Sequence, residues 1–133
     1  MTGRVAYLDT SAFVKLIVAE PETEALRRFL QRWPEPASST LLRTETIRAL
    51  RHSGHGDHTG AARRLFSTLR LVRLDEPLLD RAGDLDPLTL RSLDAIHLAA
   101  AIALGSDLGV FVTYDERLGD AARGRGLIVE TPS

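Results

Sequence analysis

Apolar residues follow two kinds of pattern along this chain. Short apolar runs such as VAYL and VFVTY are typical of strands buried in a sheet, whereas apolar residues repeated every three or four positions predict helices. Proline, glycine and polar residues separate the segments. Strands are expected at residues 5–8, 35–39, 71–75, 110–114 and 127–130, and helices at residues 10–20, 21–33, 40–52, 61–70, 77–85, 92–104 and 115–126.

Strands and helices alternate from one end of the chain to the other. This order predicts an α/β layer fold with a mainly parallel sheet. Pro21 opens the second helix and Pro34 ends it, and Ser92 is placed to cap the helix over 92–104. The second strand, around residues 37–39, is poor in β-branched residues, which makes it the weakest strand of the five.

Composition narrows the class of protein. A chain of 133 residues with 44% apolar residues is expected to form one domain over residues 1–133. There is no cysteine for disulfides or thiolate metal sites, which favours the cytoplasm. The longest apolar run falls short of the roughly 20 residues that a membrane span needs. A net charge of −1 excludes the overall basic character of many nucleic-acid binders and leaves a local patch possible.

Two aspartates directly follow predicted strands. Asp9 comes after the first strand and Asp115 after the strand over 110–114. The carboxyl ends of parallel strands meet at one edge of the sheet, where ligands usually bind. Each aspartate also has a structural interpretation, because an aspartate between a strand and a helix is a common N-cap.

Two further acids lie in helical segments. Asp94 occupies the first turn of a helix that is apolar on almost every side, where it either complements the helix dipole or serves a function. His97, one turn later, is interpreted as a hydrogen-bonded packing residue. Glu45 lies among apolar positions, and periodicity leaves open whether it faces solvent or the sheet.

These acids are informative as a group. Two carboxylates about 4 Å apart repel by about 4 kcal/mol at an effective dielectric near 20, so a cluster requires protonation or a bound cation. Oxygen ligands suit Mg²⁺ or Mn²⁺, and Mg²⁺ takes its remaining ligands from water and phosphate. The cluster therefore indicates phosphoryl transfer or phosphodiester hydrolysis.

Four motifs carry a resemblance to a known family. YLDTSAFVKL, TETIRAL, LDAIHLAAAIALG and VTYDERLGDAA, in this order, resemble the PIN-domain nucleases, and most closely the VapC toxins of bacterial toxin–antitoxin pairs. The resemblance covers nearly the whole chain. It implies a three-layer α/β/α sandwich with a mainly parallel five-stranded sheet and a metal-dependent endoribonuclease.

The resemblance also implies roles for individual residues. Ser11 and Thr113 fall where the family places hydroxyls that support the carboxylates, although ordinary helix-start and strand chemistry explains them equally. We expect Mg²⁺ or Mn²⁺ held by the acids to bind the scissile phosphate and activate a water, which leaves a 5′-phosphate and a 3′-hydroxyl. The acidic quartet, interpreted as both catalytic and metal-binding, is Asp9, Glu45, Asp94 and Asp115.

Partners follow from the same resemblance. We expect an RNA substrate, a VapB-like antitoxin that sends an arginine toward the acids, and a homodimer. Leu30 and Trp33 are candidates for an exposed apolar groove that receives the antitoxin. Arg43, Arg48 and Arg117 lie near the quartet in the sequence and are candidate phosphate contacts.

One segment suggests a different metal site. HSGHGDHTG places His52, His55 and His58 at three-residue intervals together with Asp57. Its three glycines predict a loop between helices, and the spacing does not match a zinc motif. We interpret the segment as a loop.

Other functions remain as alternatives. A dinucleotide-binding domain requires a G-x-G-x-x-G turn after the first strand, which LDTSAF lacks. A phosphatase with an aspartate nucleophile requires a second carboxylate two residues after Asp9, where this chain has Ser11. An RNA-processing nuclease that is not a toxin and a non-catalytic binding module with the same fold stay open.

Overall fold

The computed structural model describes residues 2–133, and its sheet has five parallel strands in the order β3-β2-β1-β4-β5. The predicted α/β class with a parallel five-stranded sheet is therefore confirmed. The weak second strand forms because it is inserted between β1 and β3 and pairs with both. The strands are β1 (Val5–Leu8), β2 (Glu35–Ser39), β3 (Arg70–Val72), β4 (Leu108–Val112) and β5 (Val129–Glu130).

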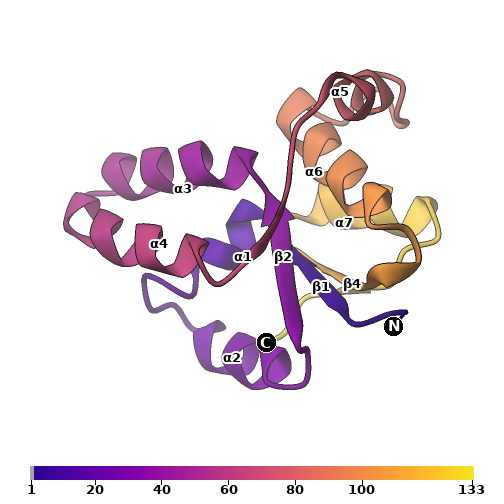
Figure 1. Cartoon of the computed structure of the whole chain (residues 1–133). Coiled ribbons are helices and arrows are strands. Elements are labelled where there is room, and N and C mark those ends of the chain that lie inside the picture. Colours follow the sequence, from indigo (N-terminus) through magenta and orange to yellow (C-terminus); the bar gives the residue numbers. More distant parts are fainter. Residues whose placement is uncertain (1) are drawn as a thin grey trace.

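Helices cover both faces of this sheet. Figure 1 shows α6 and α7 on one side of the strands, α1 and α2 on the other, and α3 and α4 as a hairpin beside them. Single 3₁₀ turns lie at Gly56–His58 and Gly105–Asp107. The α-helices are α1 (Thr10–Val14), α2 (Thr23–Leu30), α3 (Leu41–His52), α4 (Thr59–Phe66), α5 (Glu76–Gly83), α6 (Ser92–Ala103) and α7 (Glu116–Gly124).

The central strand β1 divides the core in two. Successive side chains of a strand point to opposite faces, so Val5 and Tyr7 pack with α5, α6 and α7, whereas Ala6 and Leu8 pack with α1 and α2. All four residues have no exposed surface. A third apolar cluster joins α1 to the α3–α4 hairpin.

The apolar side chains of Leu30 and Trp33 are not the exposed pair that the sequence suggested. Both are half-buried and pack against the β1–β4 side of the core. The indole of Trp33 lies over Gly109 of β4, where a Cβ atom would stand 2.3 Å from the ring. The expectation that these two side chains are exposed is wrong, because both pack against the core and Gly109 leaves room for the Trp33 indole.

Several predicted helix bounds differ from the observed ones. The second helix spans Thr23–Leu30 instead of 21–33, so that Pro21 precedes it, and two other differences have a visible cause. The first helix stops at Val14 instead of continuing to residue 20, because the chain turns so that the buried Lys15 pairs with Glu20 and Glu22. Ser92 is the first residue of α6 and does not cap it, since Arg91 holds the N-cap position without a side-chain hydrogen bond.

The order of strands determines where a site can form. The chain proceeds outward from β1 through β2 to β3, then crosses to β4 on the other side of β1. Ligands of open α/β sheets bind at such a reversal, outside the carboxyl ends of the strands. In residues 2–133, no helix is both long and apolar enough to cross a membrane.

Candidate functional site

The acids of the predicted quartet come from four different elements near this reversal. Asp9 directly follows β1, and Asp115 lies three residues after β4. Glu45 projects from the second turn of α3, and Asp94 lies in the first turn of α6. The structure settles the orientation of Glu45, whose side chain is 21% exposed and turned toward α1 and α6.

Asp9 is the most buried of the four acids. Its exposed fraction is 4%, and its hydrogen bonds come from the amide of Ala12 (3.0 Å) and the hydroxyls of Ser11 (2.7 Å) and Thr113 (2.6 Å). Burial raises the pKa of this carboxyl, and the bonds from Thr113 and Ser11 only partly offset that rise. Within residues 2–133 no lysine or arginine forms an ion pair with Asp9. It is thus both a helix cap and a buried acid without a counter-ion.

Two hydroxyls connect Asp9 to the loop after β4. Thr113, 1% exposed, donates to Oδ2 of Asp9 and accepts the amide N–H of Asp115 at 3.0 Å. Ser11 donates to Oδ1 of Asp9 and accepts the amide N–H of Tyr114 at 2.9 Å. Each hydroxyl therefore uses its one proton on the acid and its oxygen on the backbone, which holds the ends of β1 and β4 in a single arrangement.

Asp115 and Asp94 share one basic partner. Oδ1 of Asp115 caps α7 by accepting the amide of Leu118 at 2.9 Å, which leaves Oδ2 outside the helix. Arg91 donates from Nη2 to that Oδ2 at 3.5 Å and from Nε to Oδ2 of Asp94 at 3.3 Å. The Arg91 side chain is 72% exposed, so it balances the two carboxylates from the solvent side.

Glu45 is held by a buried chain of hydrogen bonds that sequence reasoning missed. Its Oε1 accepts from Thr10 Oγ1 and from His97 Nε2, both at 2.6 Å. On the other side of the imidazole, Nδ1 of His97 lies 2.7 Å from the hydroxyl of Tyr7. The interpretation of His97 as a packing residue is therefore incomplete, since the 2% exposed ring joins the core to an acid of the site.

The hydrogen-bond partners determine where the hydrogens in this chain of bonds lie. An ionised carboxylate only accepts, so Nε2 of His97 carries the hydrogen toward Glu45. A neutral ring then has its lone pair on Nδ1 and accepts from Tyr7, whose phenol pKa is raised by burial. Burial also acts to raise the pKa of Glu45, but the hydrogen bonds from His97 and Thr10 outweigh it, and the pKa lies below its usual value.

The quartet has the ligand chemistry of a Mg²⁺ or Mn²⁺ site, since all four side chains offer a metal ion carboxylate oxygens. In the conformation described for residues 2–133, no three acidic or histidine side chains converge closely enough to hold a metal ion. Asp94 and Asp115 are turned to Arg91, and Glu45 is turned to His97. Convergence on a cation thus requires side-chain rotation, and Arg91 is exposed enough to leave.

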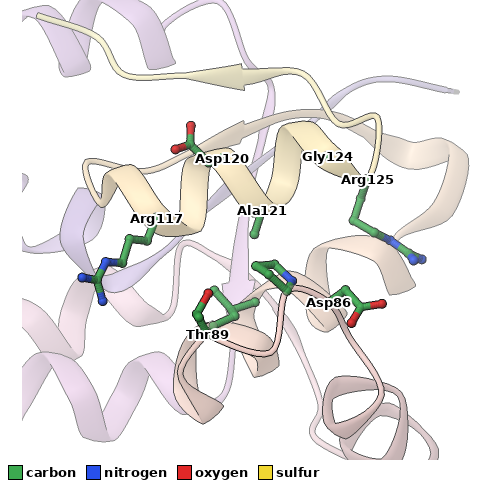
Figure 2. Close-up of a pocket in the computed structure, with 9 residues that line it drawn as sticks. Asp86, Thr89, Arg117, Asp120, Ala121, Gly124 and Arg125 are labelled. Carbon is green, nitrogen blue, oxygen red and sulfur yellow. The ribbon is translucent and has the colours of Figure 1, made fainter.

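The three candidate arginines separate into two places. Arg43 and Arg48 line a groove of about 290 Å³ between α3 and α4. Arg117 instead lies near one end of α7, beside a larger cavity of about 580 Å³ between α7 and residues 86–90 (Figure 2). Arg117 therefore lies on a different surface from the other two arginines.

In the conformation of residues 2–133, the side chains of the histidine loop do not gather around one point. His55 and His58 lie 5.8 Å apart between ring centroids, and Nδ1 of His55 is 2.9 Å from the hydroxyl of Ser53. Asp57 and His58 are separated by 4.0 Å, and their side chains are 82% and 42% exposed. The segment forms the turn between α3 and α4, in agreement with its interpretation as a loop.

Comparison with known proteins gives consistent results. A model of the PIN domain matches residues 6–124. Ribonuclease VapC46 of Mycobacterium tuberculosis is 51% identical over 127 residues, covering 96% of this chain and 97% of that protein.

Solved structures share the fold at lower identity. The Mycobacterium tuberculosis VapC20 structure, described as a Sarcin-Ricin loop cleaving toxin, superposes with a TM-score of 0.76 at 18% identity, covering 96% of this chain and 99% of that one. A toxin–antitoxin complex from Klebsiella pneumoniae gives a TM-score of 0.71 at 21% identity, covering 96% and 98%. The motifs of the sequence, the strand order and these comparisons agree, and the chain belongs to the PIN-domain family, within its group of VapC ribonucleases.

Proposed function

We propose that this protein is a metal-dependent endoribonuclease and the toxin of a toxin–antitoxin pair, which arrests translation or growth by cutting cellular RNA in the cytoplasm. The observation that carries the proposal is Asp9, buried at the reversal of the sheet without a basic partner, with three further acids on the neighbouring elements. A buried acid of this kind is costly unless a cation joins it. The VapC relatives provide the independent support.

The metal we propose is Mg²⁺ or Mn²⁺, held by Asp9 and Asp94 with Glu45 and Asp115. When bound, a divalent ion polarises the phosphate and makes water a better nucleophile at neutral pH. The protein itself contributes rigidity. Ser11 and Thr113 hold Asp9 in one orientation, so the site does not have to reorganise during the reaction. None of these side chains needs to act as a nucleophile.

The direct test is incubation of the purified protein with total RNA, with Mg²⁺, with Mn²⁺ and with EDTA, followed by mapping of the cleaved ends. We expect cleavage only with metal, leaving 5′-phosphates, and no cleavage by Asp94→Asn. Asp75→Asn is the control, because Asp75 is likewise an aspartate at the start of a helix, which it caps (Leu78 amide to Oδ1, 2.9 Å), but lies outside the quartet. Cleavage that survives EDTA or Asp94→Asn would overturn the proposal.

Toxicity is tested separately, by inducing the wild type and Asp94→Asn in a bacterial host. We expect growth arrest only with the wild type, relieved by co-expression of a small protein encoded next to this chain. The solved relatives in toxin–antitoxin complexes support such a partner. Cleavage of RNA without growth arrest would instead favour an RNA-processing nuclease.

We also propose a homodimer through the face around α5, α6 and the loop between them. Leu79, Leu88 and Leu93 are 41%, 93% and 49% exposed, and Leu79 and Leu88 line an apolar groove of about 250 Å³. Clustered exposed apolar side chains mark interaction surfaces. The neighbouring cavity carries both charge signs on its rim, which suits contact between two copies of one surface. Its charged residues are Asp86, Asp120, Arg117 and Arg125.

The dimer is tested by sedimentation equilibrium of the wild type, Leu88→Ser and Ile128→Ser. Ile128 is the matched control, since it is 65% exposed and does not line this groove. We expect a dimer for the wild type and Ile128→Ser, and a monomer for Leu88→Ser. Equal masses for the two variants would reject this face as the interface.

A further inference from the structure

The hairpin of α3 and α4 forms a groove that the acids of the site do not use. We call it the hairpin groove, and its volume is about 290 Å³. Three of its lining side chains are exposed arginines, and within residues 2–133 none of the three forms an ion pair. The groove is lined by Arg43, Thr44, Ile47, Arg48, Arg63 and Phe66.

Positive charge is concentrated on this hairpin. Residues 41–66 contain five arginines and two acids, whereas the rest of the chain has twelve basic and sixteen acidic residues. Neither acid opposes the groove, because Glu45 is turned to His97 and Asp57 lies in the turn at the far end. The near-neutral total of the chain therefore conceals one strongly basic surface, of the kind that attracts polyanions.

One arginine of the groove, Arg43, is held against an aromatic ring before any ligand binds. The guanidinium of Arg43 lies 5.1 Å from the centroid of the Phe66 ring, which is 3% exposed and forms the floor. Stacking of this kind reduces the side-chain freedom that is lost when a ligand is bound. A guanidinium fork held in place matches the two oxygens of a phosphate.

The groove begins next to the proposed reaction centre. Arg48 follows Glu45 by three positions on α3, and helix residues three apart are neighbours on the same surface, with Cβ atoms about 5–6 Å apart. Arg63 then continues the basic surface onto α4. An RNA strand whose scissile phosphate lies at the acids can therefore continue past Arg48 along the groove.

From these observations we propose that the hairpin groove binds the phosphate backbone of the single-stranded RNA substrate on one side of the cut. This inference rests on the proposed ribonuclease function. A protein segment would need apolar anchors, but Phe66 is covered and Ile47 is half-buried. The exposed large apolar residues of the described chain lie elsewhere, at Leu79, Leu88, Leu93 and Ile128.

The test compares two triple variants with the same change of charge. One replaces Arg43, Arg48 and Arg63 by alanine in the groove. The control replaces Arg28, Arg32 and Arg81, which are also exposed and without ion pairs within residues 2–133. Arg32 stacks over Phe29 at 5.4 Å much as Arg43 does over Phe66, so the control also removes one stacked arginine.

Binding of a fluorescent single-stranded RNA is measured by anisotropy in EDTA at several salt concentrations. For the groove variant we expect a Kd at least about tenfold weaker at low salt and a log–log salt slope smaller by about 2, as loss of three phosphate contacts predicts. For the control variant we expect a Kd within about twofold of the wild type, since its three arginines lie outside the hairpin groove. A third variant, with lysine at the three groove positions, keeps the charge and most of the salt slope.

Cleavage kinetics with metal separate binding from chemistry. We expect the groove variant to raise KM for this RNA about tenfold with kcat little changed, because the contacts are made before and during the reaction alike. Thermal unfolding by circular dichroism verifies that both triple variants are folded. If the triple alanine variant does not fold, the lysine variant and the single variant Arg63→Ala replace it in these measurements.

Three results would overturn the inference. Equal weakening by both triple variants would show an effect of net charge alone. If the groove variant binds RNA as tightly as the wild type, with or without loss of a protein partner, then RNA does not bind in the groove. The ribonuclease proposal would be unaffected. A wild type that neither binds nor cleaves RNA would instead reject the proposed function and this inference with it.

Discussion

His97 and Glu45 lie 52 positions apart in the chain and are joined by a hydrogen bond of 2.6 Å from Nε2 to Oε1. The bond crosses from α6 to α3 and continues through Nδ1 of His97 to the hydroxyl of Tyr7 in the sheet. It therefore ties one acid of the site to the core of the protein. In residues 2–133, Oε2 of Glu45 has no protein partner and is the oxygen left for the site.

Replacing His97 should weaken the site without unfolding the protein. His97→Leu removes the donor to Glu45, and loss of a hydrogen bond that orients a metal-binding side chain typically reduces metal affinity or activity about 10- to 100-fold. We expect that reduction in Mn²⁺ affinity by calorimetry and in RNA cleavage. His97→Gln keeps an N–H donor and should restore much of both. Equal affinities for the wild type and His97→Leu would show that the bond does not position Glu45.

Tyr7→Phe isolates the other end of the same chain of bonds. The ring can keep its stacking on Phe111, 5.4 Å away between centroids, but Nδ1 of the buried His97 loses its donor. An unsatisfied buried acceptor costs about 1–3 kcal/mol, so the free energy of unfolding should fall by that amount in urea. Tyr114→Phe is the control, since its hydroxyl donates to the carbonyl of Pro132 from a half-buried position and should cost less.

Asp9→Asn should separate function from stability. The amide side chain retains an oxygen that caps α1, and it removes a buried charge that has no counter-ion. We expect loss of metal-dependent cleavage with a free energy of unfolding within about 1 kcal/mol of the wild type, because cap and charge effects oppose each other. Asp75→Asn, the cap of α5, should leave cleavage intact. Cleavage by Asp9→Asn would exclude Asp9 as a metal ligand.

Arg91 should compete with a metal ion for Asp94 and Asp115. Its two ion pairs, at 3.3 and 3.5 Å, are made by a side chain that is 72% exposed. Exposed pairs are worth about 0.2–1 kcal/mol, so Arg91→Gln should bind Mn²⁺ about two- to fivefold more tightly. Arg123→Gln is the control, because Arg123 makes a similar 3.3 Å pair with Asp120 away from the quartet. Weaker binding by Arg91→Gln would mean that Arg91 supports the site instead.

Gly109→Ala tests the packing of Trp33 on β4. The added Cβ would lie 2.3 Å from the indole and 2.4 Å from the backbone oxygen of Gly3, so the ring or the strand must shift. Overpacking typically costs about 1–3 kcal/mol, which urea unfolding measures. Gly119→Ala in α7 is the contrast, since its nearest contact is 3.5 Å and alanine favours a helix. Equal stabilities would show that the contact yields without cost.

Local patterns were sufficient for the fold and for the placement of Asp9 and Asp115. Apolar periodicity is set by neighbouring residues, so it predicted every strand, including the weak β2, and the alternation that requires a parallel sheet. The same rule placed Asp9 and Asp115 at one sheet edge, and both also cap helices as the structural interpretation held. The ends of elements were less accurate, because the burial of Lys15 and the position of Arg91 depend on distant contacts.

The sequence by itself thus determined the α/β class, the position of Asp9 and Asp115 at the sheet edge and the family. Only the tertiary structure decided what each acid touches. Glu45 is hydrogen-bonded to Thr10 across 35 positions, and His97 to Tyr7 across 90. The return of α4 brings Arg63 to the groove that Arg43 also lines. Periodicity says which side of an element is apolar, but hydrogen bonds and charge patches depend on which elements pack together, and that is a property of the folded chain.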